Sequence, residues 1–192
     1  VGSDQEPTGP PPGFHNALSV NSSLAEFLSP YSLSCSNFGC VAGNVWILGG
    51  HRSVLARNFT REGSDFAGLT AEVVDHTLAE SMIDASAIEV VHVANAFGEM
   101  FAGQAHLGAM PATVHDGLWD TPATRHEAAC ASGSVAALAA IADLRAGNYR
   151  TALVVGVELE KTVPGDTAAQ HLGAAAWTGH EGADATFLWP SM

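Results

Sequence analysis

The stretch RHEAACASGSVAALAAIADLRAG, residues 125–147, is made almost entirely of small and apolar residues. From residue 131 to about residue 145 no proline interrupts it, and apolar side chains surround the whole circumference of the expected helix instead of lining one stripe. A helix with this pattern is typical of a buried core. Gly147 is a natural C-terminal stop. The segment therefore predicts a buried helix at the centre of the fold.

Apolar strands and one amphipathic helix flank this segment. Residues 151–158 (TALVVGVE), 88–97 (IEVVHVANAF) and 45–48 (VWIL) are β-branched or apolar runs that favour strands. Ser64 is a candidate N-cap with Asp65 in the first turn, and apolar residues at helical spacing follow as far as Leu78. Strands thus alternate with helices, which predicts an α/β protein with right-handed crossovers.

Cys130 stands between two alanines where the central helix should begin. Unpaired backbone amides and the positive end of the helix dipole favour the thiolate form of a cysteine in that position. Small neighbours leave room for a carbonyl group, and the Cys130 amide can donate one hydrogen bond to an oxyanion. This arrangement suits acyl transfer. A buried structural cysteine in a small-residue packing layer is the alternative.

The composition narrows the possible functions. The 192 residues carry 7 Lys and Arg against 20 Asp and Glu, a net charge of −13, which argues against nucleic acid and anionic membranes as partners. The chain lacks a run of about 20 apolar residues and an N-terminal signal pattern, so we expect a cytoplasmic protein. Three cysteines do not form a disulfide framework. Residues 1–40 contain five of the nine prolines and eight serines, and we expect a disordered N-terminal extension.

Three quoted segments together resemble the thiolase superfamily, in particular acetyl-CoA acetyltransferase-like members related to the lipid-transfer-protein thiolases. These segments are EAACASGS, AGNYRTALVVGVE and GDTAAQHLGAAAWTGHEGADATFLWP. The resemblance implies a thiolase-like N-terminal half, with a mixed, mostly parallel sheet flanked by helices over residues 41–161. It implies the start of a loop domain, truncated, over residues 162–192. By the same resemblance Cys130 is the acylated nucleophile of a reversible Claisen condensation or thiolysis.

A coenzyme A thioester is then the substrate, and no cofactor is permanently bound. The resemblance also implies a homo-oligomer, or a complex with a thiolase or OB-fold partner protein. Thiolases have a second half that supplies an Asn-Glu motif, a Gly-His-Pro motif with the activating histidine, and a Cys-x-Gly motif. None of these occurs in the sequence: Gly179-His180 is followed by glutamate, and Cys35 and Cys40 match nothing. We therefore expect a weakly active or inactive chain that is a fragment, one subunit of a split enzyme or a pseudo-enzyme.

Two alternatives to the acyltransferase remain open. One is a non-catalytic, thiolase-like scaffold that pairs with a complete thiolase or an OB-fold protein. The other is a fragment of a ketoacyl synthase-like condensing enzyme, whose cysteine lies on a similar helix.

Other polar residues carry less information. His126 and Cys130 are four residues apart, but no second pair accompanies them and His126 is expected on the preceding strand, so we predict no metal site. Glu158, Glu160 and Lys161 follow a strand, and we expect them to form a solvated rim.

Overall fold

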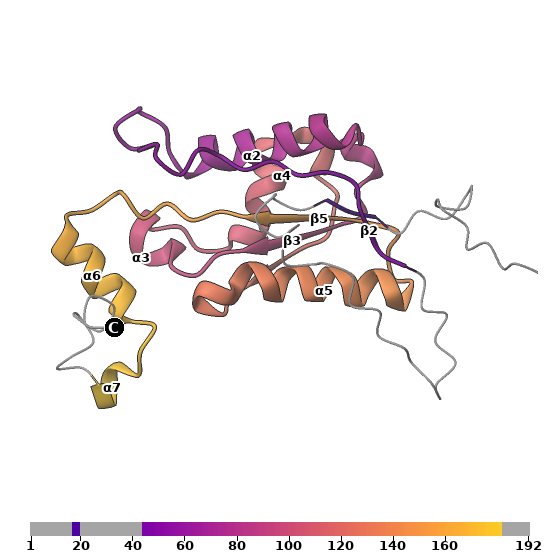
Figure 1. The fold of residues 1–192 in the computed structure, drawn as a ribbon. Helices are drawn as coiled ribbons and strands as arrows, with labels where there is room; N and C mark the ends of the chain where they lie inside the picture. The colour runs from indigo at the N-terminus through magenta and orange to yellow at the C-terminus, as the bar shows by residue number, and fades with distance from the viewer. Residues whose placement is uncertain (1–16, 20–43, 182–192) are drawn as a thin grey trace, which may run out of the picture.

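In the computed structural model, residues 17–19 and 44–181 are described (Figure 1). Five strands form one sheet in the order β2-β1-β5-β3-β4. They are β1 (Ala17–Ser19), β2 (Trp46–Ile47), β3 (Val90–Ala94), β4 (Ala123–His126) and β5 (Thr151–Gly156). Helices α2 (Phe66–Ser81) and α4 (Met110–Val114) cover one face, and α5 (Ser132–Ala146) covers the other (Figure 1). The predicted α/β layer architecture is confirmed.

All described strand pairs are parallel, in line with the mixed, mostly parallel sheet that the resemblance led us to expect. In the register, Val91 of β3 faces Leu153 of β5 on one side and Ala123 of β4 on the other. Because the strands are parallel, their carboxyl ends lie at one edge. The loops that follow β3, β4 and β5 therefore meet there.

The N-terminal extension differs from the prediction at one place. Ala17–Ser19 form β1, which pairs with β2 and β5 through its backbone. The rest of the predicted disordered extension, residues 1–16 and 20–40, lies outside the described residues. The sequence pattern could not reveal β1, because three residues are too few to show a strand period.

Alternation along the strands separates two cores. Val91 and Val93 pack with α2 residues such as Leu69 and Val74. Val90 and Ala94 point to the opposite face, where they pack against α5. The N-cap of α2 is Asp65, whose side chain accepts a hydrogen bond from the Gly68 amide, so the predicted N-cap Ser64 is off by one residue.

Helix α5 begins at Ser132 and ends at Ala146, and the following Gly147 has a φ of 74° that provides the left-handed stop. Its sheet-facing side packs Ala136, Ala140 and Leu144 against the strands. The outer side remains exposed within the described residues, with Leu138 61% exposed. The prediction of burial on all sides is therefore wrong for this side, because the pattern of a helix does not reveal how many layers surround it.

By length and composition, residues Ala129–Ala146 are apolar enough to cross a membrane. The same segment contacts β3, β4 and β5, which is the position of a core helix. The segment that is apolar enough to cross a membrane is therefore a helix that packs against the sheet on one side.

Shorter helices lie on the side of the sheet where the strands end (Figure 1). These are α3 (Gly98–Ala102), α6 (Gly165–Gly173) and α7 (Thr178–Glu181). The Phe101 and His171 rings join α3 to α6 edge to face at 5.0 Å, and Thr162 Oγ1 donates to the Phe101 carbonyl at 2.7 Å. Thr162 and helix α6, from the predicted loop-domain start, thus pack against α3 (Figure 1), and residues 182–192 lie outside the described part.

Candidate functional site

Cys130 lies at the turn that leads from β4 into α5. It occupies the middle of a 3₁₀ turn, Ala129–Ala131, directly before the first residue of the helix. The residue is exposed and its thiol is free. It lines a cavity of about 450 Å³ together with Ala94 and Gly156, the last residues of β3 and β5. Carboxyl ends of parallel strands are where α/β proteins commonly bind ligands. The alternative of a buried structural cysteine does not agree with this exposure.

The residue before Cys130 has an unusual backbone. Ala129 has a φ of 48°, in the left-handed region that is unfavourable for residues with a side chain. For an L-residue this conformation costs about 1–2 kcal/mol. The surrounding contacts must offset this cost for the turn to persist.

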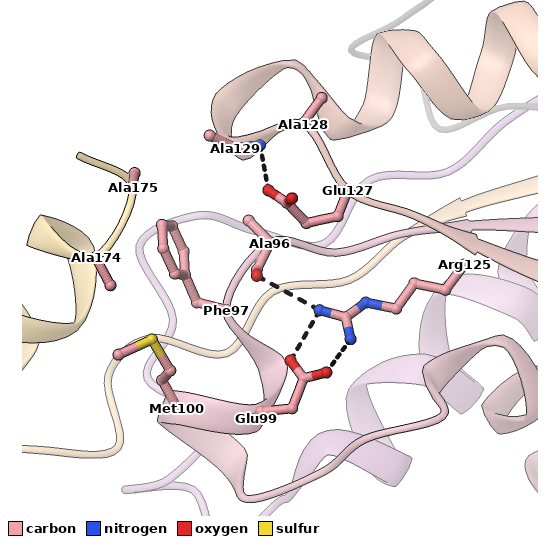
Figure 2. Close-up of a pocket in the computed structure, with 10 residues that line it drawn as sticks. All are labelled: Ala96, Phe97, Glu99, Met100, Arg125, Glu127, Ala128, Ala129, Ala174 and Ala175. Atoms are coloured by element: carbon pink, nitrogen blue, oxygen red, sulfur yellow. Dashed lines mark hydrogen bonds and ion pairs between the residues drawn. The ribbon is translucent and has the colours of Figure 1, made fainter. Parts of the chain in front are cut away.

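Two side chains hold the turn. Glu127 Oε1 accepts a hydrogen bond from the Ala129 amide at 2.6 Å, which Figure 2 shows as a dashed line. The Ser132 hydroxyl accepts from the Ala128 amide at 2.9 Å and donates to the Ala129 carbonyl at 2.7 Å. The Ala129 amide is thus bonded by Glu127, which precedes Cys130, and the Ala129 carbonyl is bonded by Ser132, which follows it.

Glu158 ties the end of β5 to the segment after β3. Its Oε2 accepts from the Ala96 amide at 2.8 Å, and its Oε1 accepts from Asn95 Nδ2 at 3.0 Å. Weaker bonds of 3.3–3.4 Å reach it from the Phe97 amide. Burial raises the pKa of this carboxyl above its usual range, although the amide bonds oppose the shift. Asn95 and Glu158 both line the Cys130 cavity.

The predicted solvated rim is therefore wrong for Glu158. Glu160 is exposed, as expected, but Lys161 Nζ donates to the Leu55 and Arg57 carbonyls. A sequence signal for Glu158 existed, because a carboxylate directly after a fully apolar parallel strand lies at the carboxyl edge. What the pattern could not show is that the loop after β3 supplies its hydrogen-bond donors.

A second cavity, of about 660 Å³, lies on the other side of the Ala96–Phe97 segment. Arg125 of β4 enters it and pairs with Glu99 of α3 through two bonds (Figure 2). Arg125 Nη2 also donates to Asn95 Oδ1 at 2.9 Å. The pair with Arg125 holds the pKa of Glu99 below its usual range. The ion pair joins β4 to α3, and the bond to Asn95 adds the loop after β3. Sequence reasoning missed the ion pair because its residues are 26 positions apart.

His126 lies on β4, as predicted, and its imidazole contacts another imidazole instead of Cys130. His92 Nδ1 and His126 Nε2 are 2.9 Å apart, and the rings stack at 5.1 Å between centroids. Burial lowers the pKa of both rings. Asp143 of α5 lies 3.4 Å from His92 Nε2, an atom with no hydrogen-bond partner in the described part of the chain.

The remaining candidates lie apart from this site or outside the described residues. His180 is in α7 and stacks on Trp177. Cys35 and Cys40 belong to residues that the structure does not describe. Over residues 17–19 and 44–181, no group of three or more His, Cys, Asp and Glu side chains could hold a metal ion.

The described residues define an α/β protein with a parallel sheet and an exposed cysteine before its central helix. Residues 45–185 match the family described as the N-terminal domain of thiolase. The chain belongs to the thiolase family, and the predicted resemblance to its N-terminal half is confirmed.

Two curated proteins are similar to the chain, and both are named acetyl-CoA acetyltransferase. The protein of Methanocaldococcus jannaschii is 36% identical over 104 residues, 54% of this chain and 26% of that protein. The protein of Methanothermobacter thermautotrophicus is 29% identical over 93 residues, 48% of this chain and 24% of that protein. The chain thus matches about a quarter of the length of each relative.

Proposed function

We propose that this chain is the N-terminal half of a thiolase-type acyltransferase, in which Cys130 accepts an acyl group from a coenzyme A thioester. The observation that carries the proposal is the position of Cys130. It is exposed before α5 and lines a cavity at the carboxyl edge of the sheet, in a chain that matches the N-terminal domain of thiolase.

In the proposed first step, the Cys130 thiolate attacks the carbonyl carbon of the thioester. A bond forms from Sγ to that carbon, and the negative charge moves to the carbonyl oxygen. The Cys130 amide has no hydrogen-bond partner among the described residues, so it can donate to that oxygen. The bond from carbon to the coenzyme A sulfur then breaks, and the released thiolate takes up a proton.

In the second step the acyl group passes from Cys130 to a carbon nucleophile, or back to coenzyme A in the reverse direction. No hydrogen bond joins the thiol to a basic side chain in the described part of the chain. In line with the resemblance, we assign activation to a histidine of the second thiolase half. Losing such a base typically slows a reaction by about 10² to 10⁴, so the 192-residue chain should acylate slowly and turn over poorly.

Acetylation of Cys130 tests the first step. The folded chain is incubated with acetyl-CoA, digested and analysed by peptide mass spectrometry, while released coenzyme A is measured by chromatography. We expect one acetyl group on Cys130, formed faster than on Cys35 or Cys40, and none at position 130 in Cys130→Ala. Equal labelling of all three cysteines, or no adduct on Cys130 in folded protein, would contradict the proposal.

A second candidate function is a non-catalytic scaffold that pairs with a complete thiolase or an OB-fold protein. The exposed apolar side of α5, with Val135 and Leu138, favours this candidate because such a surface is usually covered. A stable co-purifying partner together with an unreactive Cys130 would support the scaffold over the enzyme.

A further inference from the structure

The turn around Cys130 is strained at one residue. In the described part of the chain, three non-glycine residues have positive φ: Met82, His106 and Ala129. Met82 caps the end of α2, where a left-handed residue is common. Ala129 instead lies between the end of β4 and the start of α5, one residue before Cys130. The conformation of Ala129 therefore sets the orientation of the backbone at Cys130, the next residue.

The contacts that hold Ala129 come from side chains with no other hydrogen bond in the described part of the chain. Glu127 is exposed, and its Oε1 bonds the Ala129 amide. Ser132 is 6% exposed, and its hydroxyl uses both its donor and its acceptor on the same turn. Together they bond both the amide and the carbonyl of Ala129. Neither bond reaches the Cys130 amide or thiol, which stay free for a ligand in the cavity.

We propose that Glu127 and Ser132 are positioning residues: they hold Ala129 left-handed so that the Cys130 thiol and amide face the 450 Å³ cavity together. This inference rests on the proposed function, in which both groups act on one thioester carbonyl. Without the two bonds, Ala129 relaxes to a negative φ, and the thiol moves away from the amide end of α5. The reacting groups then lose the alignment on which their rate depends.

The test measures alkylation of Cys130 by iodoacetamide at pH 7, followed peptide by peptide, because this reaction does not require thiolase activity. We expect Glu127→Ala to slow alkylation of Cys130 by about tenfold, because the displaced thiol leaves the free amides at the start of α5, which favour its nucleophilic form. Glu127→Gln keeps an oxygen acceptor for the Ala129 amide, so it should stay within about twofold of the wild type. Because Cys130 is already exposed in the folded chain, loss of folding is tested separately from the alkylation rate.

Ser132→Ala and Ser134→Ala form a matched pair on α5. The Ser134 hydroxyl makes no hydrogen bond among the described residues, so its loss should not change the rate. Ser132→Ala should slow alkylation, as Glu127→Ala does. Circular dichroism and a thermal melt of each variant confirm that the chain remains folded.

Ala129→Gly provides the rescue, because glycine adopts positive φ at little cost. In this background, Glu127→Ala should slow alkylation less than it does in the wild-type chain. An equal effect in both backgrounds, or a rate within about twofold of the wild type for Glu127→Ala alone, would overturn the inference.

Parallel incubation with acetyl-CoA separates this inference from the proposed function. If the wild type is not acetylated on Cys130 but Glu127→Ala still slows alkylation, the proposed function fails and the positioning role stands. If the wild type is acetylated and Glu127→Ala changes neither rate, the proposed function stands and the positioning role fails.

Discussion

Asn95 and Glu158 bind each other at the ends of two neighbouring strands, with Asn95 Nδ2 3.0 Å from Glu158 Oε1. Asn95 Nδ2 also donates to the Val157 carbonyl at 2.7 Å, and Asn95 Oδ1 accepts from the Gly98 amide at 2.8 Å. A single amide side chain thus connects the loop after β3, the end of β5 and the start of α3. This connection forms one wall of the Cys130 cavity.

Replacing Asn95 should therefore destabilise the chain strongly. Asn95 is 2% exposed, and Asn95→Ala leaves the Val157 carbonyl and the Gly98 amide without these partners. We expect a loss of about 2–4 kcal/mol in the free energy of unfolding, measured with urea. Asn148→Ala is the control, since Asn148 is exposed and bonds only Asp143 in the described structure. A similar loss in both variants would contradict this role of Asn95.

The ionisation of Glu158 should make stability depend on pH. Burial raises the pKa of this carboxyl in the folded chain, so the folded state holds the proton more tightly than the unfolded state. The contribution of Glu158 is therefore fullest below its unfolded pKa and is lost as pH rises through the folded pKa. We expect the stability of the wild type relative to Glu158→Gln to increase as pH falls from 7 towards 4.5. A constant difference between the two unfolding curves would contradict the prediction.

The histidine pair should act in the opposite sense. Burial lowers the pKa of His92 below its ordinary 6.5, and the neighbouring His126 adds to the shift. The unfolded state then binds protons more tightly, so stability from His92 is present above about pH 6.5 and is lost at lower pH. His92→Gln should show a smaller fall in melting temperature than the wild type between pH 7.5 and 5. An equal fall in melting temperature for the two proteins would show that His92 does not contribute to the pH dependence of stability.

The two sides of α5 should respond differently to truncation. Leu144 is fully buried against the sheet, and Leu144→Ala should cost about 2–5 kcal/mol in the free energy of unfolding. Leu138 is 61% exposed on the same helix, and Leu138→Ala should change it by less than about 0.5 kcal/mol. Denaturant unfolding of both variants measures the contrast. A large loss for Leu138→Ala that grows with protein concentration would show that a second copy covers this side.

Much of the fold could be predicted from local patterns. The run without proline from residue 131 predicted α5, and the apolar run at residues 151–158 contains β5. The small residues around Cys130 indicated a thiolase. These features depend on residues close together in the chain. The strand at residues 88–97 was predicted too long, because Ala96 and Phe97 bond Glu158 instead of continuing the sheet.

The supporting contacts of the candidate site could not be predicted in this way. Glu158, Arg125 and His92 each bond a partner more than 20 positions away, through strands that lie side by side only in the folded sheet. Likewise, no local pattern shows that the outer side of α5 stays exposed within the described residues.

The sequence by itself determined the alternation of strands and helices around α5, the resemblance to the family and the place of Cys130 before a helix, because short-range periodicity and a local motif carry that information. Only the tertiary structure decided which polar groups meet at the carboxyl edge, and that Ala129 adopts a left-handed backbone between Glu127 and Ser132. The meeting of the polar groups depends on the packing of parallel strands, which brings their ends together irrespective of their distance along the chain. The backbone of Ala129 depends on short-range side-chain hydrogen bonds, whose geometry no sequence pattern shows.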